Sequence, residues 1–447
     1  MSERFDLLVR GGVCALPWGE LAECDVGIRW GRIAALGALR EASAETVIEA
    51  SGLHVLPGLI DPHVHFRDSG VPGTGDPAVE TMASGTRGAV LGGVTTVFDM
   101  PNTTPALTDA ATLAAKRALV ERAAWCNVGL YVGATRGNIA QLAALEGEAG
   151  VCALKVFAGS STGDLMVEDD ATLERVMRAG RRRIAYHSED EYRLRARREL
   201  FAGGGAYRDH AAWRDEECAF LGTRRIVALA RRTGRPAHIL HVSTAEELDW
   251  LDCYRDVASV EVLLNHLTQT APDAYDRLGA FAVMNPPIRA ARHVAAAWAA
   301  VRDGRVDTLG SDHAPHSAAA KARPWPDTAA GLTGVQTLLP VMLDHVAAGR
   351  LSLPRLVDLM AAGPARVYGA VGKGRLARGA DADLTLVDLA ARRAIAASWL
   401  ASPCGWSPFE GMRVTGWPVA TVVGGQVAMR DDELLDAPAG RAVRFNA

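Results

Sequence analysis

The fold is decided by the stretch Val55-Leu56-Pro57-Gly58-Leu59-Ile60-Asp61-Pro62-His63-Val64-His65-Phe66-Arg67. Its first half is an apolar run that predicts a buried strand. Because alternate residues of a strand point to one face, His63 and His65 project together, and Arg67 follows on that side if the strand continues. Two adjacent imidazoles can bind a transition metal, although two histidines with ordinary partners in a solvated loop would look the same. The rest of the chain has to decide between a metal site and histidines with ordinary partners.

The composition indicates a globular protein with a sizeable core, since 49% of the 447 residues are hydrophobic and 22% are charged. A net charge of −4 favours neither nucleic acid nor an anionic membrane as a partner. The seven cysteines include no Cys-x-x-Cys pair, which predicts reduced thiols in a cytoplasmic protein. The sequence shows no signal-peptide pattern and no apolar stretch long enough to span a bilayer.

From Leu59 onward, strand-like segments alternate with helix-length segments such as 78–91, 109–124 and 170–179. This alternation is typical of parallel βα units. Eight such units in series predict an α/β fold, a closed (β/α)₈ TIM-like barrel. The predicted strands are the one running into His63 and His65, then 95–99, 128–132, 153–157, 184–187, 237–241, 260–264 and 307–312.

Short strands with glycine turns occupy residues 5–56 and return after about residue 371. A chain that begins and ends this way predicts that both ends build one small β-sandwich domain. We therefore expect three segments: 1–56 and 372–447 in the small domain, and 57–371 in the barrel. Residues 203–205 and 317–328 are predicted to be loops over the barrel mouth.

Active groups in such barrels lie at the carboxyl ends of the strands. Six polar residues of this chain fall there, and their convergence is a stronger signal than any one of them. They offer four imidazoles, one amine and one carboxylate: His63, His65, Lys155, His187, His241 and Asp312.

Residue parity sorts the remaining histidines. His238 and His241 are three residues apart, so a regular strand would point them to opposite sides, and we expect His241 inward and His238 outward. His266 follows the seventh strand and is either a loop residue or a partner of a ligand. We assign no role to four others, which are His54, His210, His293 and His345.

Lys155 has two interpretations. It can pair with an acidic residue at the strand end. Alternatively, burial lowers its pKa, the neutral amine takes up CO₂, and the resulting carbamate bridges two metal ions. An ammonium group itself has no lone pair for a metal.

Four motifs of the chain resemble the dihydroorotase family of the amidohydrolase superfamily. The resemblance covers essentially the whole chain, and residues 379–384 and 408–412 look like the superfamily's small β-sandwich. Met100-Pro101-Asn102-Thr103 and His316 favour dihydroorotases over related allantoinases and hydantoinases. The motifs are Pro57-Gly58-Leu59-Ile60-Asp61-Pro62-His63-Val64-His65-Phe66-Arg67-Asp68, Asp99-Met100-Pro101-Asn102-Thr103, Asn285-Pro286-Pro287-Ile288-Arg289 and Ser311-Asp312-His313-Ala314-Pro315-His316.

The resemblance implies reversible hydrolysis of L-dihydroorotate to N-carbamoyl-L-aspartate, a step of pyrimidine biosynthesis. It implies two Zn²⁺ per chain, although the same ligand types suit other divalent metals. Asp312 would act as the catalytic base and then as the acid. The implied metal ligands are His63, His65 and Asp312 for one ion, His187 and His241 for the other, and a carboxylated Lys155 as the bridge. The implied substrate contacts are Arg67, Asn102 and His316 at the carboxylate and Asn285 at the ring.

Lys155 departs from the pattern of long dihydroorotases, which often have Asp at the bridging position. Leu154-Lys155-Val156-Phe157 instead resembles the carboxylated lysine of hydantoinases, allantoinases and short dihydroorotases. Another cyclic amidase therefore stays open, as does a catalytically silent homologue that scaffolds a partner enzyme, although every ligand position is filled. We expect a small-molecule substrate and a homo-oligomer, either a dimer or a tetramer.

Overall fold

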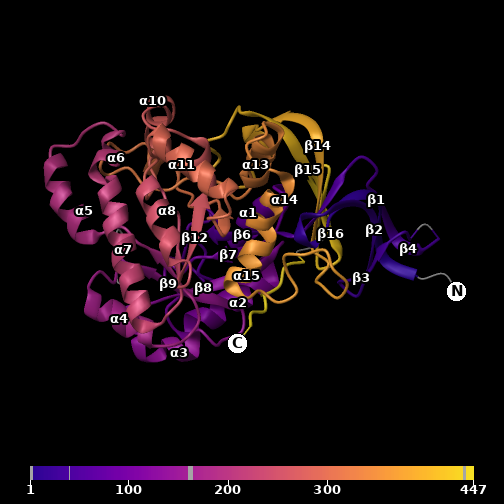
Figure 1. Cartoon of the computed structure of the whole chain (residues 1–447), viewed down its shortest axis with the longest axis horizontal. Coiled ribbons are helices and arrows are strands. Elements are labelled where there is room, and N and C mark those ends of the chain that lie inside the picture. Colours follow the sequence, from indigo (N-terminus) through magenta and orange to yellow (C-terminus); the bar gives the residue numbers. More distant parts are fainter. Residues whose placement is uncertain (1–3, 40, 160–164, 436–438, 447) are drawn as a thin grey trace.

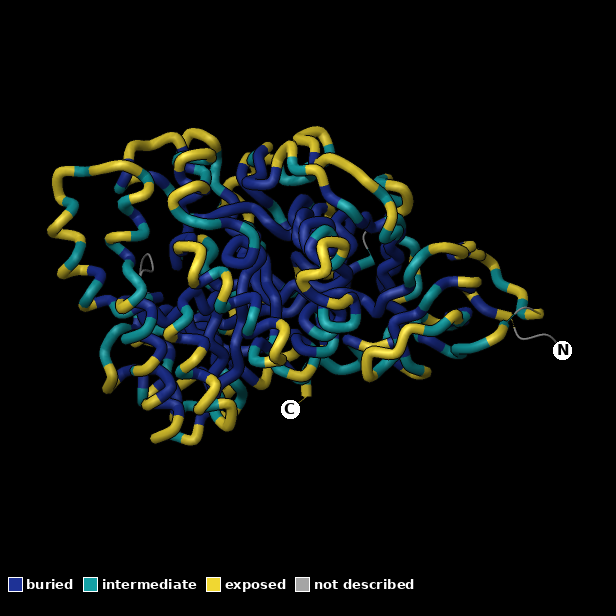
Figure 2. The backbone as a smooth tube through the Cα atoms, turned by 45° about the horizontal axis from the view of Figure 1, so that its top comes forward, coloured by how far each residue is buried: buried dark blue, intermediate teal, exposed yellow. Residues whose placement is uncertain are grey.

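The computed structural model describes residues 4–39, 41–159, 165–435 and 439–446. Its strands form two separate sheets, one of eight strands and one of nine. Helices surround the eight-stranded sheet, and the nine-stranded sheet lies to one side of this larger body (Figure 1). Burial follows the same division, because the strands at the centre of the larger body are buried while the helices around them expose one side (Figure 2).

The eight-stranded sheet is the predicted parallel barrel. Its strands pair in chain order, and a parallel bridge between Val64 and His313 brings the first strand to the segment that follows the last. The His65 amide also donates to the His313 carbonyl at 2.7 Å. All eight predicted strands are present: β6 (Leu59–Val64), β7 (Val94–Asp99), β8 (Asn127–Gly133), β9 (Val151–Phe157), β10 (Ile184–His187), β11 (Ala237–Ile239), β12 (Ala258–Leu263) and β13 (Thr308–Gly310).

The helices begin where side chains cap them. The first was predicted from residue 78 but begins at Met82, because the Thr81 hydroxyl accepts from the Ser84 amide at 3.0 Å and sets the N-terminus. The barrel helices are α1 (Met82–Leu91), α2 (Ala110–Ala123), α3 (Leu142–Leu145), α4 (Asp170–Arg178), α5 (Glu191–Arg198), α6 (Asp209–Trp213), α7 (Glu216–Thr233), α8 (Ala245–Leu251), α9 (Leu264–Thr268), α10 (Asp273–Leu278), α11 (Ala291–Arg302), α12 (Ala318–Lys321), α13 (Leu338–Ala347), α14 (Leu353–Val357), the π-helical turn η7 (Asp358–Ala362) and α15 (Gly363–Tyr368).

Both ends of the chain build the nine-stranded sheet, as predicted. β5 joins the two halves, because it pairs with β1 on one side and with β14 on the other. Leu7, Val26, Leu384 and Val422 share a small core within this sheet. Its strands are β1 (Arg4–Ala15), β2 (Leu21–Arg29), β3 (Arg32–Gly37), β4 (Ser43–Glu49), β5 (His54–Pro57), β14 (Leu384–Ala394), β15 (Arg413–Val423), β16 (Gln426–Arg430) and β17 (Glu433–Leu434).

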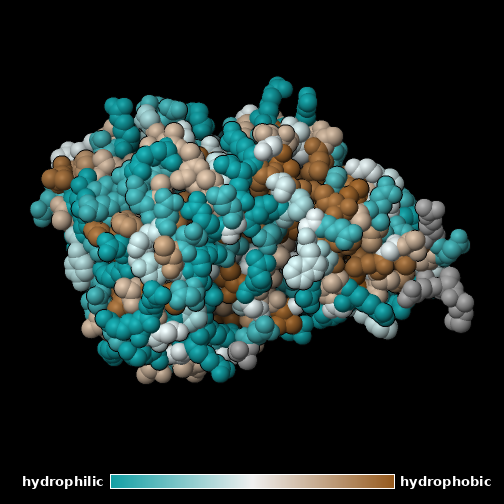
Figure 3. All heavy atoms as spheres, viewed as in Figure 1, coloured by the Kyte–Doolittle hydropathy of each residue, from teal (hydrophilic) through white to brown (hydrophobic). Residues whose placement is uncertain are grey.

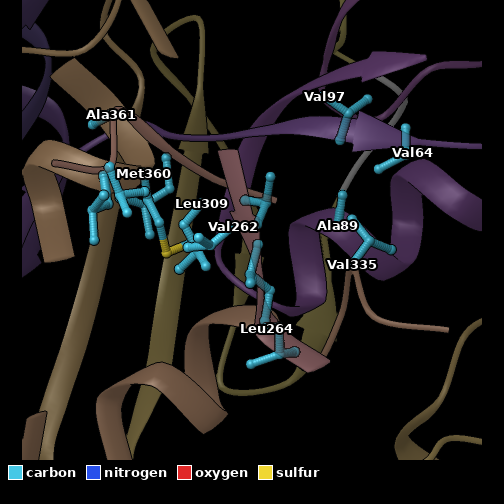
Figure 4. Close-up of a cluster of buried hydrophobic side chains, with 14 of the residues drawn as sticks. Val64, Ala89, Val97, Val262, Leu264, Leu309, Val335, Met360 and Ala361 are labelled. Carbon is cyan, nitrogen blue, oxygen red and sulfur yellow. The ribbon is translucent and has the colours of Figure 1, made fainter. Parts of the chain in front are cut away.

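Alternation along the barrel strands separates two environments. One set of side chains points outward and packs against the helices, as Leu309 of β13 does beside Met360 of η7 (Figure 4). The other set points into the barrel, which Tyr368 fills from the amino ends of the strands. The Tyr131 hydroxyl donates to that of Tyr368 at 2.6 Å. At the carboxyl ends of the strands the interior opens into a cavity, which His63, His187 and Asp312 line.

Among the described residues, no helix is long and apolar enough to cross a membrane. The face drawn in Figure 3 is mostly hydrophilic, and its apolar side chains gather where α13 and α14 approach the terminal sheet.

Candidate metal centre

Three of the predicted ligands converge on one point at the barrel rim. Nε2 of His63 and Nε2 of His65 lie 3.2 and 3.0 Å from the same carboxylate oxygen, Oδ1 of Asp312. The two imidazole nitrogens are 3.3 Å apart. One ligand atom from each residue therefore falls in a cluster whose members all lie within 4.8 Å of one another. A single divalent cation fits such a cluster.

The other two predicted histidines form a second pair next to the first group. Nδ1 of His187 lies 3.0 Å from Nε2 of His241, and the His241 ring centroid is 5.5 Å from that of His63. Lys155 is fully buried and lines the same cavity. Within the described part of the chain, its Nζ has no hydrogen-bond partner. The predicted ion pair between Lys155 and an acidic residue is therefore not formed, and all six predicted groups line one cavity.

The backbone leaves regular strand geometry at two of these ligands. His241 and Asp312 have φ angles of 40° and 48°, the left-handed region that costs a non-glycine residue about 1–3 kcal/mol. β11 already ends at Ile239, so parity does not carry through to His241. The prediction that His238 points outward is wrong for this reason. His238 points into the barrel, where it contacts Ser259 at 2.7 Å and stacks edge-on against Tyr368.

Acidic and amide side chains orient the ligand histidines. Glu261 accepts from Nδ1 of His63 at 2.7 Å, and the same oxygen accepts from the His241 amide at 3.1 Å. Asn102 accepts from Nδ1 of His65 at 2.6 Å. In each ring this contact fixes the proton on one nitrogen and leaves the lone pair of the other facing the cluster.

Glu189 orients the His187 ring in the same way. Glu189 accepts from Nε2 of His187 at 2.8 Å, which leaves Nδ1 facing His241. Glu189 is itself held by an ion pair with the buried Arg214. Sequence reasoning missed both Glu189 and Glu261. Glu189 follows His187 by two residues and could have been found by spacing, whereas Glu261 lies in an apolar strand with no local signal.

Electrostatics favour the metal-binding forms of His65, His187 and Asp312. Burial opposes the charge of His63, but Asp312 and Glu261 outweigh it and raise the pKa of His63 above its usual value. Burial lowers the pKa of His65 to about 4, and it lowers the pKa of His187 below its usual value. Burial opposes the charge of Asp312, but His63 and His65 outweigh it and hold the pKa of Asp312 well below its usual range. Burial also lowers the pKa of Lys155 to about 7, so a neutral amine is accessible near neutral pH.

The donor set fits a pair of divalent cations. Imidazole nitrogens and a carboxylate oxygen suit zinc and its neighbours among the transition metals. Glu261 and Asp312 bring two buried negative charges to the cluster, which bound cations would offset. The unpartnered amine of Lys155 is the one group that needs modification before it can serve as a ligand.

The predicted substrate contacts surround a cavity of about 600 Å³ above the cluster. Arg67 donates to the Pro315 carbonyl at 3.3 Å and lies 3.3 Å from Nε2 of His316. Asn102 lines the cavity while it holds His65, and Asn285 lines it from the opposite side, where its Oδ1 accepts from Nε2 of the buried His210 at 2.9 Å.

Two histidines outside the predicted set have structural contacts. His210, which was assigned no role from the sequence, accepts from the Trp325 indole at 3.2 Å and so donates from its other nitrogen to Asn285. His266 is buried and contacts the Pro286 carbonyl at 3.1 Å, next to the same segment. Both support the segment that carries Asn285 and lie outside the candidate ligand set.

The fold and sequence have close counterparts among known proteins. Residues 54–428 match the model of the Amidohydrolase family. A dihydroorotase of Halobacterium salinarum is 35% identical over 423 residues, which cover 94% of this chain and 96% of that protein. An allantoinase of Rubrobacter xylanophilus is 34% identical over 456 residues, 98% of each chain. The solved structure of an L-hydantoinase (dihydropyrimidinase) from Arthrobacter aurescens has a TM-score of 0.92 and 28% identity, covering 98% of this chain and 100% of that chain.

Replacing Glu261 with Gln is expected to weaken metal binding by about 10- to 100-fold, because the amide holds the His63 ring less firmly and removes a compensating charge. Competition with a chromophoric chelator measures the affinity. Glu247→Gln is the matched control, since Glu247 is also buried and its side-chain hydrogen-bond partners among the described residues are Thr223, Ser243 and Thr244. Equal affinities in the wild type and Glu261→Gln would contradict the orienting role.

Proposed function

The chain belongs to the amidohydrolase family of hydrolytic enzymes, and we propose that it is a dihydroorotase, which opens the ring of L-dihydroorotate to give N-carbamoyl-L-aspartate. The cyclic amidase class is common to its relatives, which are named dihydroorotase, allantoinase and L-hydantoinase. The choice of dihydroorotate among cyclic amides is the proposal.

Arg67 carries this proposal. Its guanidinium lines the cavity beside His65 and Asp312, and in the described ranges it forms no ion pair with a carboxylate. A half-buried cation without a counter-ion favours a substrate that brings a negative charge. The planar guanidinium fork matches a carboxylate with two parallel hydrogen bonds. Dihydroorotate has such a carboxylate, on the ring carbon that is two bonds from the carbonyl carbon under attack.

We assign the metal ligands as the two groups of the candidate centre. His63, His65 and Asp312 would hold one ion, His187 and His241 the other, and Lys155 would join them once carboxylated. When bound, zinc ions lower the pKa of water to near 7 and polarise the amide carbonyl. Glu261, Asn102 and Glu189 orient the rings so that the free lone pairs of His63, His65 and His187 would face the ions.

The chain's own groups then move the protons. Asp312 is ionised, buried and at the centre of the cluster, so its carboxylate can accept the proton of the attacking water. The same carboxyl then delivers that proton to the leaving ring nitrogen, serving first as base and then as acid. Arg67 and His316 hold the substrate carboxylate, Asn285 contacts the ring, and Asn102 lies between His65 and the cavity.

A hydantoinase or allantoinase activity is the second candidate. Relatives with those names match this chain about as well as the dihydroorotases do. Lys155 also resembles the bridging lysine of hydantoinases and allantoinases more than the Asp of many long dihydroorotases. A catalytically silent scaffold has less support, because the chain retains the whole ligand set.

Arg67→Met is expected to lower kcat/KM for dihydroorotate by about ten- to a hundredfold, the loss of one charge-assisted bond of roughly 1.5–3 kcal/mol. Activity on the neutral analogue dihydrouracil should be unaffected by the same substitution, which makes it the internal control. The wild type is assayed side by side on dihydroorotate, dihydrouracil, hydantoin and allantoin. If it hydrolyses dihydrouracil as efficiently as dihydroorotate, the assignment fails and the hydantoinase hypothesis replaces it.

Lys155 is expected to carry a carboxyl group, because its buried amine has no hydrogen-bond partner among the described residues and its neutral form reacts with CO₂. Protein supplied with ¹³C-bicarbonate should show one carbamate resonance by NMR. Lys155→Ala should abolish that resonance, the two-metal site and most activity, and short carboxylic acids should restore part of the activity. An active, metal-loaded protein without a carbamate signal would refute the modification.

A further inference from the structure

The chain has four lysines, and the side chain of each is buried: Lys116, Lys155, Lys321 and Lys373. A buried lysine normally needs a counter-ion. Lys116 pairs with Asp99 at 2.6 Å, and Lys373 pairs with Asp381 at 3.1 Å and also with Asp383. Lys155 belongs to the candidate metal centre. The burial of Lys321 is not explained by an ion pair or by the candidate metal centre.

Lys321 ends α12 and is fully buried. Its Nζ donates three hydrogen bonds, all to backbone carbonyls: 2.9 Å to Val283, 2.8 Å to Ala329 and 3.1 Å to Gly331. In the described ranges no carboxylate pairs with it, and burial lowers the pKa of Lys321 to about 7. An ammonium group has three N–H donors, so all three donors of Lys321 are bound to these carbonyls.

The three carbonyls come from the two segments that line the substrate cavity. Val283 lies two residues before Asn285, which lines the cavity, and Ala329 and Gly331 line it themselves. The segments also meet directly, since the Gly331 amide donates to the Val283 carbonyl at 3.0 Å. Lys321 thus ties the segment of Asn285 to the far side of the loop that carries His316.

The loop packs closely on the residues it supports. A Cβ at Gly331 would lie 2.5 Å from the Ala314 carbonyl and 3.0 Å from the His316 ring. The Ala330 carbonyl lies 3.0 Å from Nε2 of His316. A shift of the loop would therefore displace His316 and, through its contact with Nε2, Arg67.

We propose that Lys321 is a positioning residue for substrate recognition, which gathers the carbonyls of the two cavity segments and so fixes His316 and Asn285 against the bound ring. Lys321 touches neither the candidate ligands nor the cavity. The proposal rests on the proposed function for the identity of the substrate, and on geometry alone for the role of Lys321.

Lys321→Met tests it, because methionine keeps an unbranched side chain of similar length but donates no hydrogen bond. KM for L-dihydroorotate should rise about tenfold or more, kcat should change by less than about threefold, and metal content should equal that of the wild type. Hydrogen exchange should accelerate in peptides covering 283–289 and 314–332 but not in peptides from the barrel strands.

Lys373→Met is the matched control, because it is the same change at a buried lysine whose ion-pair partners among the described residues are Asp381 and Asp383. It should lower thermal stability without raising KM. An unchanged KM in Lys321→Met, a loss confined to kcat, or an equal rise of KM in Lys373→Met would overturn the proposal. Should Lys321→Met not fold, Lys321→Gln is measured in the same way, and the same outcomes decide.

If the wild type does not hydrolyse dihydroorotate, the proposed function fails. The Lys321 experiment is then run on whichever of dihydrouracil, hydantoin or allantoin the wild type hydrolyses, because the two segments line the cavity for any ring that enters it. The two failures are thereby distinguishable.

Discussion

Parallel strands that close into a barrel bring their carboxyl ends to one rim, and the candidate site depends on this constraint. His63, Lys155, His187 and Asp312 come from strands or strand ends up to about 250 residues apart in the chain, yet line one cavity. Tyr131 and Tyr368 pack in a buried cluster of the interior, where their hydroxyls are hydrogen-bonded to each other. At the rim, inward-facing polar groups line a cavity with space for a ligand.

Gathering these groups has a cost that the surrounding structure offsets. Buried carboxylates lose hydration, and two ligands adopt left-handed backbone. Hydrogen bonds to Glu261, Asn102 and Glu189 hold the rings, and the arrangement leaves lone pairs facing inward. Such an assembly is most stable with cations bound, which is the state in which it would act on a substrate.

Strand periodicity was enough to predict the barrel, the shared terminal sheet and the convergence of six polar residues. Periodicity failed at His238, since β11 ends before His241 and alternation stops there. It also gave no sign of Glu261 or Lys321, whose roles depend on partners far away in the chain. Contacts across the fold, such as Lys321 with the Val283 carbonyl, follow from packing and have no local signature. The substrate remains a proposal because three kinds of relative share this architecture.

We propose that the two groups of candidate ligands form a two-metal centre that performs the hydrolysis. Elemental analysis of protein purified without chelator tests it most directly, with activity measured on the same sample. We expect close to two divalent ions per chain, most of them zinc. Removal of the metal should abolish activity, and its return should restore activity. A fully active preparation that holds no metal would contradict it.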